Sequence, residues 1–269
     1  MVGVETLDPQ SSLWAWLAYE LRRYRKRQTV SLSAAGKIVS VSASHFSNFE
    51  SGRRRPGLKK LRALDAAWET GGHFVRLFTF AQEGHDPNWF REHLLYEARA
   101  YALRIFEPLI IPGLLQTEDY ARVAIATEGS GDPEADLRLR MDRQRILTRK
   151  NPPRMHVLLD EGVLDRPVGG AKVMRAQLAR LLEFSDLPDV VVRIYPRSAG
   201  YYLGLTGAFK IMSCEPDGDI AYTEAAEGGR LVLDGPGVRR FVVRFDEIGA
   251  DSLSRSASRD VIKRAMEKM

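Results

Sequence analysis

Apolar residues recur at helical spacing through most of the first 84 residues. The positions that fall on shared helical faces are Leu13, Leu17, Leu21, Tyr24, Leu58, Leu61, Leu64 and Trp68. Spacings of three and four residues are typical of amphipathic helices. Together with the turn residues between them, they predict five helices, within residues 9–28, 31–39, 42–51, 58–70 and 74–82.

The second and third of these helices are short and are joined by a tight turn at Ser40-Val41. Ser31 and Ser42 are the expected N-caps. The third helix places Phe46 and Phe49 on one side and short polar side chains on the other. Such a helix can enter the DNA major groove, which is about 12 Å wide, without filling it. The pattern predicts a helix-turn-helix DNA reader.

Gly52 should end the third helix, and three arginines follow where a phosphate backbone would pass. The residues expected to contact DNA are Ser31, Ser42, Ala43, Ser44, His45, Ser47, Asn48, Arg53, Arg54 and Arg55. Asn48 is the best candidate for a bidentate contact to adenine, and the Ala43 methyl could meet a thymine methyl. Phosphate contact and plain solvent exposure remain open for His45. The arginines either bind phosphate or serve solubility alone.

The segment 30–56 resembles the phage-repressor (xenobiotic-response-element) helix-turn-helix family. The matching positions are Val30, Ser31, Ala35, Gly36, Val39, Val41, Ser42, Phe46, Ser47, Glu50, Gly52 and Pro56. Leu32 replaces a glutamine that often touches phosphate. Ser40 replaces the turn glycine and therefore needs a positive φ or a shifted turn. The resemblance implies that Arg25 pairs with Glu50, although Arg25 could instead belong to a solvated basic face. Homodimers that read a split palindrome are usual for this motif.

Charge separates the two parts of the chain. Residues 1–84 carry 13 Lys and Arg against 7 Asp and Glu, a net charge of +6, whereas residues 85–269 carry 27 against 28, a net charge of −1. The basic excess lies with the predicted DNA reader, as a surface that displaces counterions from DNA requires. We expect two domains, residues 1–84 and 85–269, with the boundary at residues 84–87.

The second region mixes both kinds of periodicity. Strands are expected within residues 155–159, 190–194, 208–213, 220–223 and 230–233, and residues 101–111 are extended and apolar. Helices are expected within residues 88–99, 133–150, 171–183, 238–248 and 254–268, with one more capped by Thr117. The fold class is therefore a mainly α five-helix domain followed by an α+β domain.

The second region also resembles the C-terminal domain of actinobacterial helix-turn-helix regulators of the WhiJ type, which are described as antitoxin-like. Its most specific element is the run Pro-Gly-Leu-Leu-Gln-Thr at 112–117. Further matches are Glu97, Ala100, residues 120–122, 159–169, 177–181, 195–196 and 199–200, and Ser258, Arg259 and Ile262. The resemblance implies a small acidic partner protein of the BldB-like type.

No motif of an enzyme is found. The five histidines lack metal-ligand spacing, and His156 is expected to be a core residue. We expect the Asp160-Glu161 pair to be solvated. Val168-Gly169-Gly170, which opens a helix, is expected to be a plain turn, with anion binding as the alternative. The single cysteine, Cys214, excludes an internal disulfide and a cysteine-based metal site. Neither a leader nor a span of about 20 apolar residues is present, so a soluble cytoplasmic protein without cofactor or metal is expected.

These observations predict a DNA-binding transcription regulator, most simply a repressor, whose second domain receives a signal. The source is a small protein partner or a small molecule; alternatively, the protein is antitoxin-like, sequesters its partner and autoregulates. A candidate partner or ligand surface is the loop that carries Tyr195, Arg197, Tyr201 and Tyr202, because tyrosine and arginine are enriched in interfaces. Packing of this loop on its own sheet is the competing interpretation.

Overall fold

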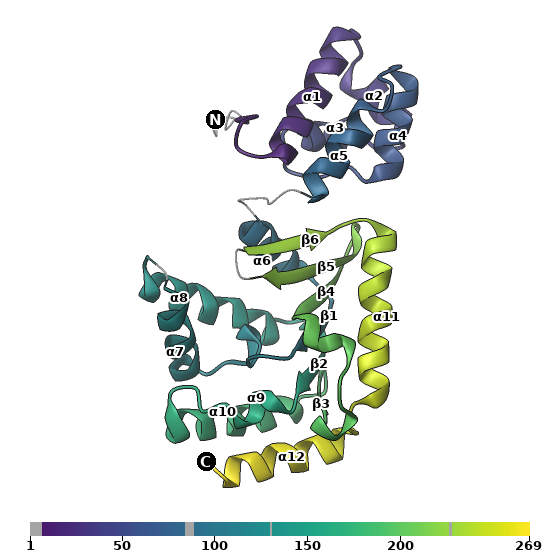
Figure 1. The fold of residues 1–269 in the computed structure, drawn as a ribbon. Helices are drawn as coiled ribbons and strands as arrows, with labels where there is room; N and C mark the ends of the chain where they lie inside the picture. The colour runs from purple at the N-terminus through teal and green to yellow at the C-terminus, as the bar shows by residue number, and fades with distance from the viewer. Residues whose placement is uncertain (1–6, 84–88, 130, 226–227) are drawn as a thin grey trace. The chain divides into compact units, whose positions relative to one another are not determined.

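Two units make up the computed structural model, Met1–Phe90 and Arg91–Met269 (Figure 1). The structure describes residues 7–83, 89–129, 131–225 and 228–269. The predicted domain boundary at residues 84–87 lies outside the described residues. Within the described part, no helix combines the length and apolar character needed to span a bilayer.

The first unit consists of five helices, as the sequence predicts. They are α1 (Leu13–Arg27), α2 (Leu32–Ile38), α3 (Ala43–Glu50), α4 (Leu58–Ala67) and α5 (His73–Glu83). The first helix begins at Leu13 rather than at Pro9, because Asp8 accepts a hydrogen bond from the Gln10 backbone and closes a turn before the Ser12 N-cap. The buried faces meet in one core that includes Leu17, Leu21, Phe46, Phe49, Leu61, Leu64 and Phe74.

The second unit is built on one six-stranded sheet with the strand order β3-β2-β1-β4-β5-β6. The strands are β1 (Ala102–Glu107), β2 (Arg154–Asp160), β3 (Val190–Tyr195), β4 (Phe209–Cys214), β5 (Gly218–Ala225) and β6 (Gly228–Val232). The first three are parallel to one another and the last three antiparallel to their neighbours. The predicted α+β class is confirmed.

Helices cover both faces of this sheet (Figure 1). They are α6 (Trp89–Arg99), α7 (Glu118–Glu128), α8 (Pro133–Arg143), α9 (Gly162–Asp165), α10 (Gly170–Ser185), α11 (Gly235–Asp251) and α12 (Arg255–Glu267). Helix α11 packs Phe245 and Ile248 onto one face of the sheet, against Phe106, Leu158 and Phe209. Helices α7, α8 and α10 lie on the opposite side.

Two predicted elements are shorter than expected. The helix expected over 133–150 ends at Arg143 and is followed by a 3-10 turn, Gln144–Leu147. The Gln144 side-chain amide donates to the carbonyls of Gly113 and Gln116, which ties the turn to a neighbouring loop. The extended stretch 101–111 is a strand only as far as Glu107.

His156 is exposed rather than part of the core, so its prediction as a core residue is wrong. It alternates along β2 with buried Met155 and Val157, and its side of the strand is incompletely covered by α11.

Candidate DNA interface

The turn between α2 and α3 explains two positions of the helix-turn-helix pattern. Ser40 adopts a φ of +55°, so it takes the left-handed conformation that the pattern normally gives to glycine. Gly36 is required for space, because a Cβ at this position would lie 2.5 Å from the Val41 carbonyl oxygen. The Val41 amide donates to the Gly36 carbonyl and closes the turn.

Helix α3 is fixed by its cap and its aromatic face. The Ser42 side chain accepts a hydrogen bond from the His45 amide, and Phe46 and Phe49 are buried in the core. The opposite side of the helix carries Ala43, Ser44, Ser47 and Asn48, of which Ser44 is exposed and the others half-buried. His45 lies at the margin of this side and packs edge-on against Phe49, with ring centroids 5.0 Å apart.

The remaining predicted DNA contacts lie around this helix. Ser31 caps α2 and is exposed. Arg53 is exposed just after Gly52, whose φ of +71° ends the helical path. The Arg54 amide donates to the Asn48 carbonyl. Arg55 lies over the Trp14 ring, 4.3 Å from its centroid, so this cation also packs against the protein itself.

Arg25 and Glu50 form the pair that the resemblance implies. Arg25 Nε donates to Glu50 Oε1 at 2.6 Å and Nη2 donates to Oε2 at 2.9 Å, while Nη1 donates to the Val30 carbonyl at 3.0 Å. The hydrogen bond to Glu50 raises the pKa of Arg25. The pair is mostly buried, with 14% and 6% of the two side chains exposed. It fixes the end of α3 to the end of α1, so both are positioning residues.

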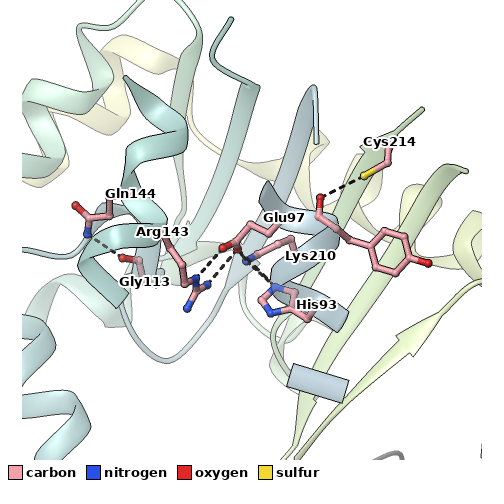
Figure 2. Close-up of polar contacts among 8 residues, drawn as sticks. His93, Glu97, Gly113, Arg143, Gln144, Lys210 and Cys214 are labelled. Atoms are coloured by element: carbon pink, nitrogen blue, oxygen red, sulfur yellow. Dashed lines mark hydrogen bonds and ion pairs between the residues drawn. The ribbon is translucent and has the colours of Figure 1, made fainter. Parts of the chain in front are cut away.

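The second unit contains a charged cluster formed by buried His93, Glu97 and Lys210 together with half-buried Arg143 (Figure 2). Arg143 Nε donates to Glu97 Oε1 at 2.7 Å, and Lys210 Nζ donates to Oε2. Burial alone would raise the pKa of Glu97, but Lys210, His93 and Arg143 hold it well below the usual range. Burial, aided by the Lys210 charge, lowers the pKa of His93 to about 4. The cluster joins α6, α8 and β4 through a carboxylate that stays ionised.

Sequence reasoning named Glu97 as part of a motif but missed its partners. The available signal was Lys210, a single cation within the apolar run Ala-Phe-Lys-Ile-Met of a predicted strand. A lysine is seldom buried in a strand unless a carboxylate meets it. That carboxylate is 113 residues away in the chain.

Three glutamines hold the loop that carries the Pro-Gly-Leu-Leu-Gln-Thr run. Gln177 Nε2 donates to the Leu115 carbonyl, and its Oε1 accepts from the Thr117 amide. Gln116 donates to the Ile111 carbonyl, and Gln144 completes the set from the end of α8. These side chains satisfy backbone groups that would otherwise be buried without partners. The run is therefore explained as a loop element of the fold.

The tyrosine loop is only in part the exposed surface that was expected. Tyr195 is buried and stacks on Tyr202 with ring centroids 3.7 Å apart, and the Tyr202 hydroxyl donates to Asp160 at 2.8 Å. Packing on the sheet therefore applies to these two tyrosines. Tyr201 remains 81% exposed, and Arg197 pairs with Asp165 at 2.6 Å.

Asp160 and Glu161 are anchors rather than a solvated pair. Asp160 accepts from the Gly162 amide as well as from Tyr202, and Glu161 accepts from the Arg197 amide. The prediction that this pair is solvated is wrong, because both carboxylates hold the tyrosine loop to the end of β2.

Cys214 is buried, and its thiol donates to the Tyr96 carbonyl at 3.3 Å (Figure 2). Burial raises the pKa of this thiol. In the part of the chain that the structure describes, no group of three or more His, Cys, Asp or Glu side chains is placed to hold a metal ion.

Comparison with known families assigns both units. Residues 16–77 match the family model described as a helix-turn-helix domain, which makes the first unit a DNA-binding domain typical of transcription regulators. No curated protein and no solved structure matches the chain. Residues 90–264, more than half of the chain, match the model described as a domain of unknown function, DUF5753. The chain therefore belongs to the DUF5753 family, with a helix-turn-helix domain preceding its family domain.

Proposed function

We propose that this protein is a sequence-specific transcription regulator that represses by binding a palindromic operator as a homodimer. The observation that carries the proposal is the geometry of α3. Its short polar side is free of aromatic residues, its cap is formed by Ser42, and its end is fixed by the buried Arg25–Glu50 pair. Arg53 adds an exposed cation beside it. This is the arrangement that reads a major groove while holding the backbone.

The second unit receives the signal in this proposal. A small acidic protein partner, as the WhiJ-type resemblance implies, is supported by Tyr201, Leu203 and Leu205, which are 81%, 50% and 53% exposed along one loop. A small molecule as the signal is supported by a cavity beside the second half of α11. In either case, the effector must bind the DNA-bound and free forms with different affinities, since only that difference shifts the equilibrium.

An antitoxin-like role differs in its main task. Sequestration of the partner would then be the primary activity, and DNA binding would serve autoregulation. The same exposed loop would carry this contact, so the two roles separate only by whether the partner changes occupancy of promoters other than the protein's own.

The test is a mobility shift on DNA from upstream of the gene, measured at several salt concentrations. Asn48→Ala should weaken binding about tenfold or more and lower discrimination at one base pair. Arg53→Ala should lower the slope of log affinity against log salt by about 0.9, as expected for one lost phosphate contact. Arg175→Ala, an exposed arginine on α10, is the matched control and should leave both unchanged.

Absence of salt-sensitive binding to this DNA and to every genomic fragment would refute DNA regulation as the function. Adding the product of a small neighbouring gene to the same assay tests the protein-partner source. A shift that changes with the neighbour supports it, and an unchanged shift removes it.

A further inference from the structure

A cavity of about 370 Å³ lies on the face of the sheet beside the second half of α11. Its floor is formed by His156 and Leu158 of β2 and Arg193 of β3, and its wall by Phe245, Asp246 and Gly249 of α11, with Val157, Val191 and Ala250 completing the lining. A space of this size is within the range of sites that take one small organic molecule. The lining combines an apolar part with a few polar groups that converge on it.

Arg193 is held in place without losing its charge. Its Nε donates to the Leu253 carbonyl at 2.7 Å, and Nη2 donates to the Ser252 carbonyl. Both acceptors are neutral, and Arg193 forms no ion pair with any residue that the structure describes. The side chain is therefore already oriented, and its positive charge is available to an anion at the cavity.

A second arginine lies beside the floor of the cavity. Arg104 is the direct cross-strand neighbour of His156. Its Nη1 forms an ion pair with Asp219 Oδ2 at 3.7 Å, but this buried nitrogen makes no hydrogen bond within the described chain. A buried guanidinium nitrogen without an acceptor is costly, and an additional acceptor oxygen would relieve that cost.

The charges around the cavity act together on His156. Partial burial of the otherwise exposed ring lowers the pKa of this histidine, and the positive charges of Arg104, Arg154, Arg193 and Arg255 lower it further. The imidazole is therefore neutral near pH 7 and can donate or accept a hydrogen bond. Asp246 is the acidic side chain of the lining. The site is thus cationic on the sheet and acidic at one point of the helix.

Gly249 supplies an independent sign that this space is kept open. Glycine within a helix is destabilising relative to alanine. Its backbone does not need glycine, because it is not among the positive-φ residues. Close packing does not need it either: a Cβ would lie 3.7 Å from Leu158 Cδ1 and 4.0 Å from Arg193 Nη1, which are ordinary contacts. The lack of a side chain at Gly249 leaves the cavity wall open beside Arg193.

We infer that this cavity binds a small organic anion. Its carboxylate or phosphate group would face Arg193 on the side of Arg104, with His156 as a neutral hydrogen-bonding partner. Its carbon skeleton would pack on Leu158 and Phe245, and a hydroxyl or amino group would donate to Asp246. The polar groups converge on a concave site rather than spreading along a surface, which favours a small molecule over an acidic peptide. The role of this ligand as the regulatory signal rests on the proposed function. Its binding to the cavity does not depend on that function.

The test is titration of the isotope-labelled full chain with citrate and with inorganic phosphate at constant ionic strength, followed by amide NMR. Glycerol serves as the neutral control. We expect saturable shifts confined to β2, β3 and the end of α11. Arg193→Gln should weaken binding at least about tenfold. Gly249→Phe should abolish it by filling the space, whereas Gly249→Ala should retain it. Arg230→Gln, an exposed arginine on β6, is the matched control and should bind as wild type.

Three results would overturn the inference. One is the absence of saturable binding by either anion. Another is a set of shifts spread over the basic surface and weakened equally by Arg230→Gln, which would indicate counterion association. The third is binding of a hexaglutamate peptide while citrate and phosphate fail, which would make the surface a protein contact. Gly249→Phe keeps the test valid should Arg193→Gln fail to fold. Operator binding is measured in a separate assay, so a failure of anion binding can be distinguished from a failure of DNA binding.

Discussion

At the scale of single residues, two carboxylates of the second unit, Glu97 and Glu107, differ in how neighbouring residues compensate their charge. The Glu97 side chain pairs with Lys210 and Arg143, whereas the Glu107 side chain forms no hydrogen bond or ion pair with any residue that the structure describes. Glu107 is half-buried at the end of β1. Burial and the nearby Glu224 raise its pKa to about 8. The folded protein therefore holds a proton on Glu107 that the unfolded chain releases near pH 4.5.

Glu107→Gln should change how stability depends on pH. Because the folded pKa is raised, the contribution of Glu107 is fully present below about pH 4.5 and is lost as pH rises through about 8. Glutamine mimics the protonated form at every pH. The stability of the variant relative to wild type should therefore increase from pH 5 to pH 9, by roughly 2 kcal/mol or more over this range. Melting temperatures at pH 5, 7 and 9 measure this gain.

The control for this comparison is Glu247→Gln, an exposed carboxylate on α11. It shows what removal of one exposed carboxylate does to the melting temperature at each of the three pH values. A difference between Glu107→Gln and wild type that stays the same from pH 5 to pH 9 would show that the pKa of Glu107 is not raised in the folded state. Both proteins contain His93, so the difference between their stabilities also cancels the contribution of this histidine. Its lowered pKa makes stability rise with pH, whereas the raised pKa of Glu107 makes stability fall.

Which residues could be predicted depended on whether their partners are local. The N-caps Ser31 and Ser42 followed from the sequence, and for Ser40 the sequence narrowed the choice to a positive φ, which the structure has, or a shifted turn. Caps and turns involve neighbours two to four residues away. The exposure of His156 and the burial of Tyr195 did not follow, since each depends on which sheet face α11 covers. The candidate cavity could not be predicted for the same reason.

At the scale of elements, the Arg25–Glu50 pair couples the reading helix α3 to α1. Glu50→Ala should destabilise the first unit by about 3–5 kcal/mol, because it leaves the Arg25 guanidinium mostly buried without its counterion. Three tryptophans, Trp14, Trp16 and Trp68, lie in α1 or at the end of α4. Urea unfolding followed by tryptophan fluorescence therefore reports on this unit.

Arg22→Ala provides the comparison, since this arginine is exposed on the same helix. It should change stability by less than about 0.5 kcal/mol. Should Glu50→Ala unfold at the same urea concentration as Arg22→Ala, the pair would contribute nothing net, and another contact would have to position α3.

The elements themselves were largely predictable, but their arrangement was not. The five helices of the first unit and five of the six strands lie within a few residues of their predicted places, because each carries its own apolar pattern. The order of the strands is set by pairings between distant segments. Strand β1 pairs with β2 in parallel and with β4 antiparallel, and neither partner can be identified from the period of the apolar residues.

At the scale of the whole molecule, the uneven charge leads to a prediction about DNA affinity. Neutralising three exposed cations of the first unit, with Lys37→Gln, Arg53→Gln and Lys59→Gln together, should lower nonspecific DNA affinity at low salt at least about tenfold. The matched triple variant in the second unit, with Lys172→Gln, Arg175→Gln and Lys263→Gln, should stay within about twofold of wild type. Fluorescence anisotropy with a labelled random duplex measures both.

An equal loss in the two triple variants would mean that the second unit also contacts DNA. The net charge of residues 85–269, −1, argues against such a contact. Charge composition thus assigns the nucleic-acid contact to one unit without reference to how the two units are placed.

The position of β1 in the sheet has a consequence for synthesis of the protein. Strand β1 is the first strand to be made, yet one of its edges pairs with β4, which begins at Phe209. At ordinary rates of translation, that edge waits for its partner for roughly 5–20 s. The first unit needs no such partner and can fold on the ribosome as soon as α5 emerges. For that interval a nascent chain already carries a folded helix-turn-helix domain, while the unit that would regulate it still exposes an unpaired strand.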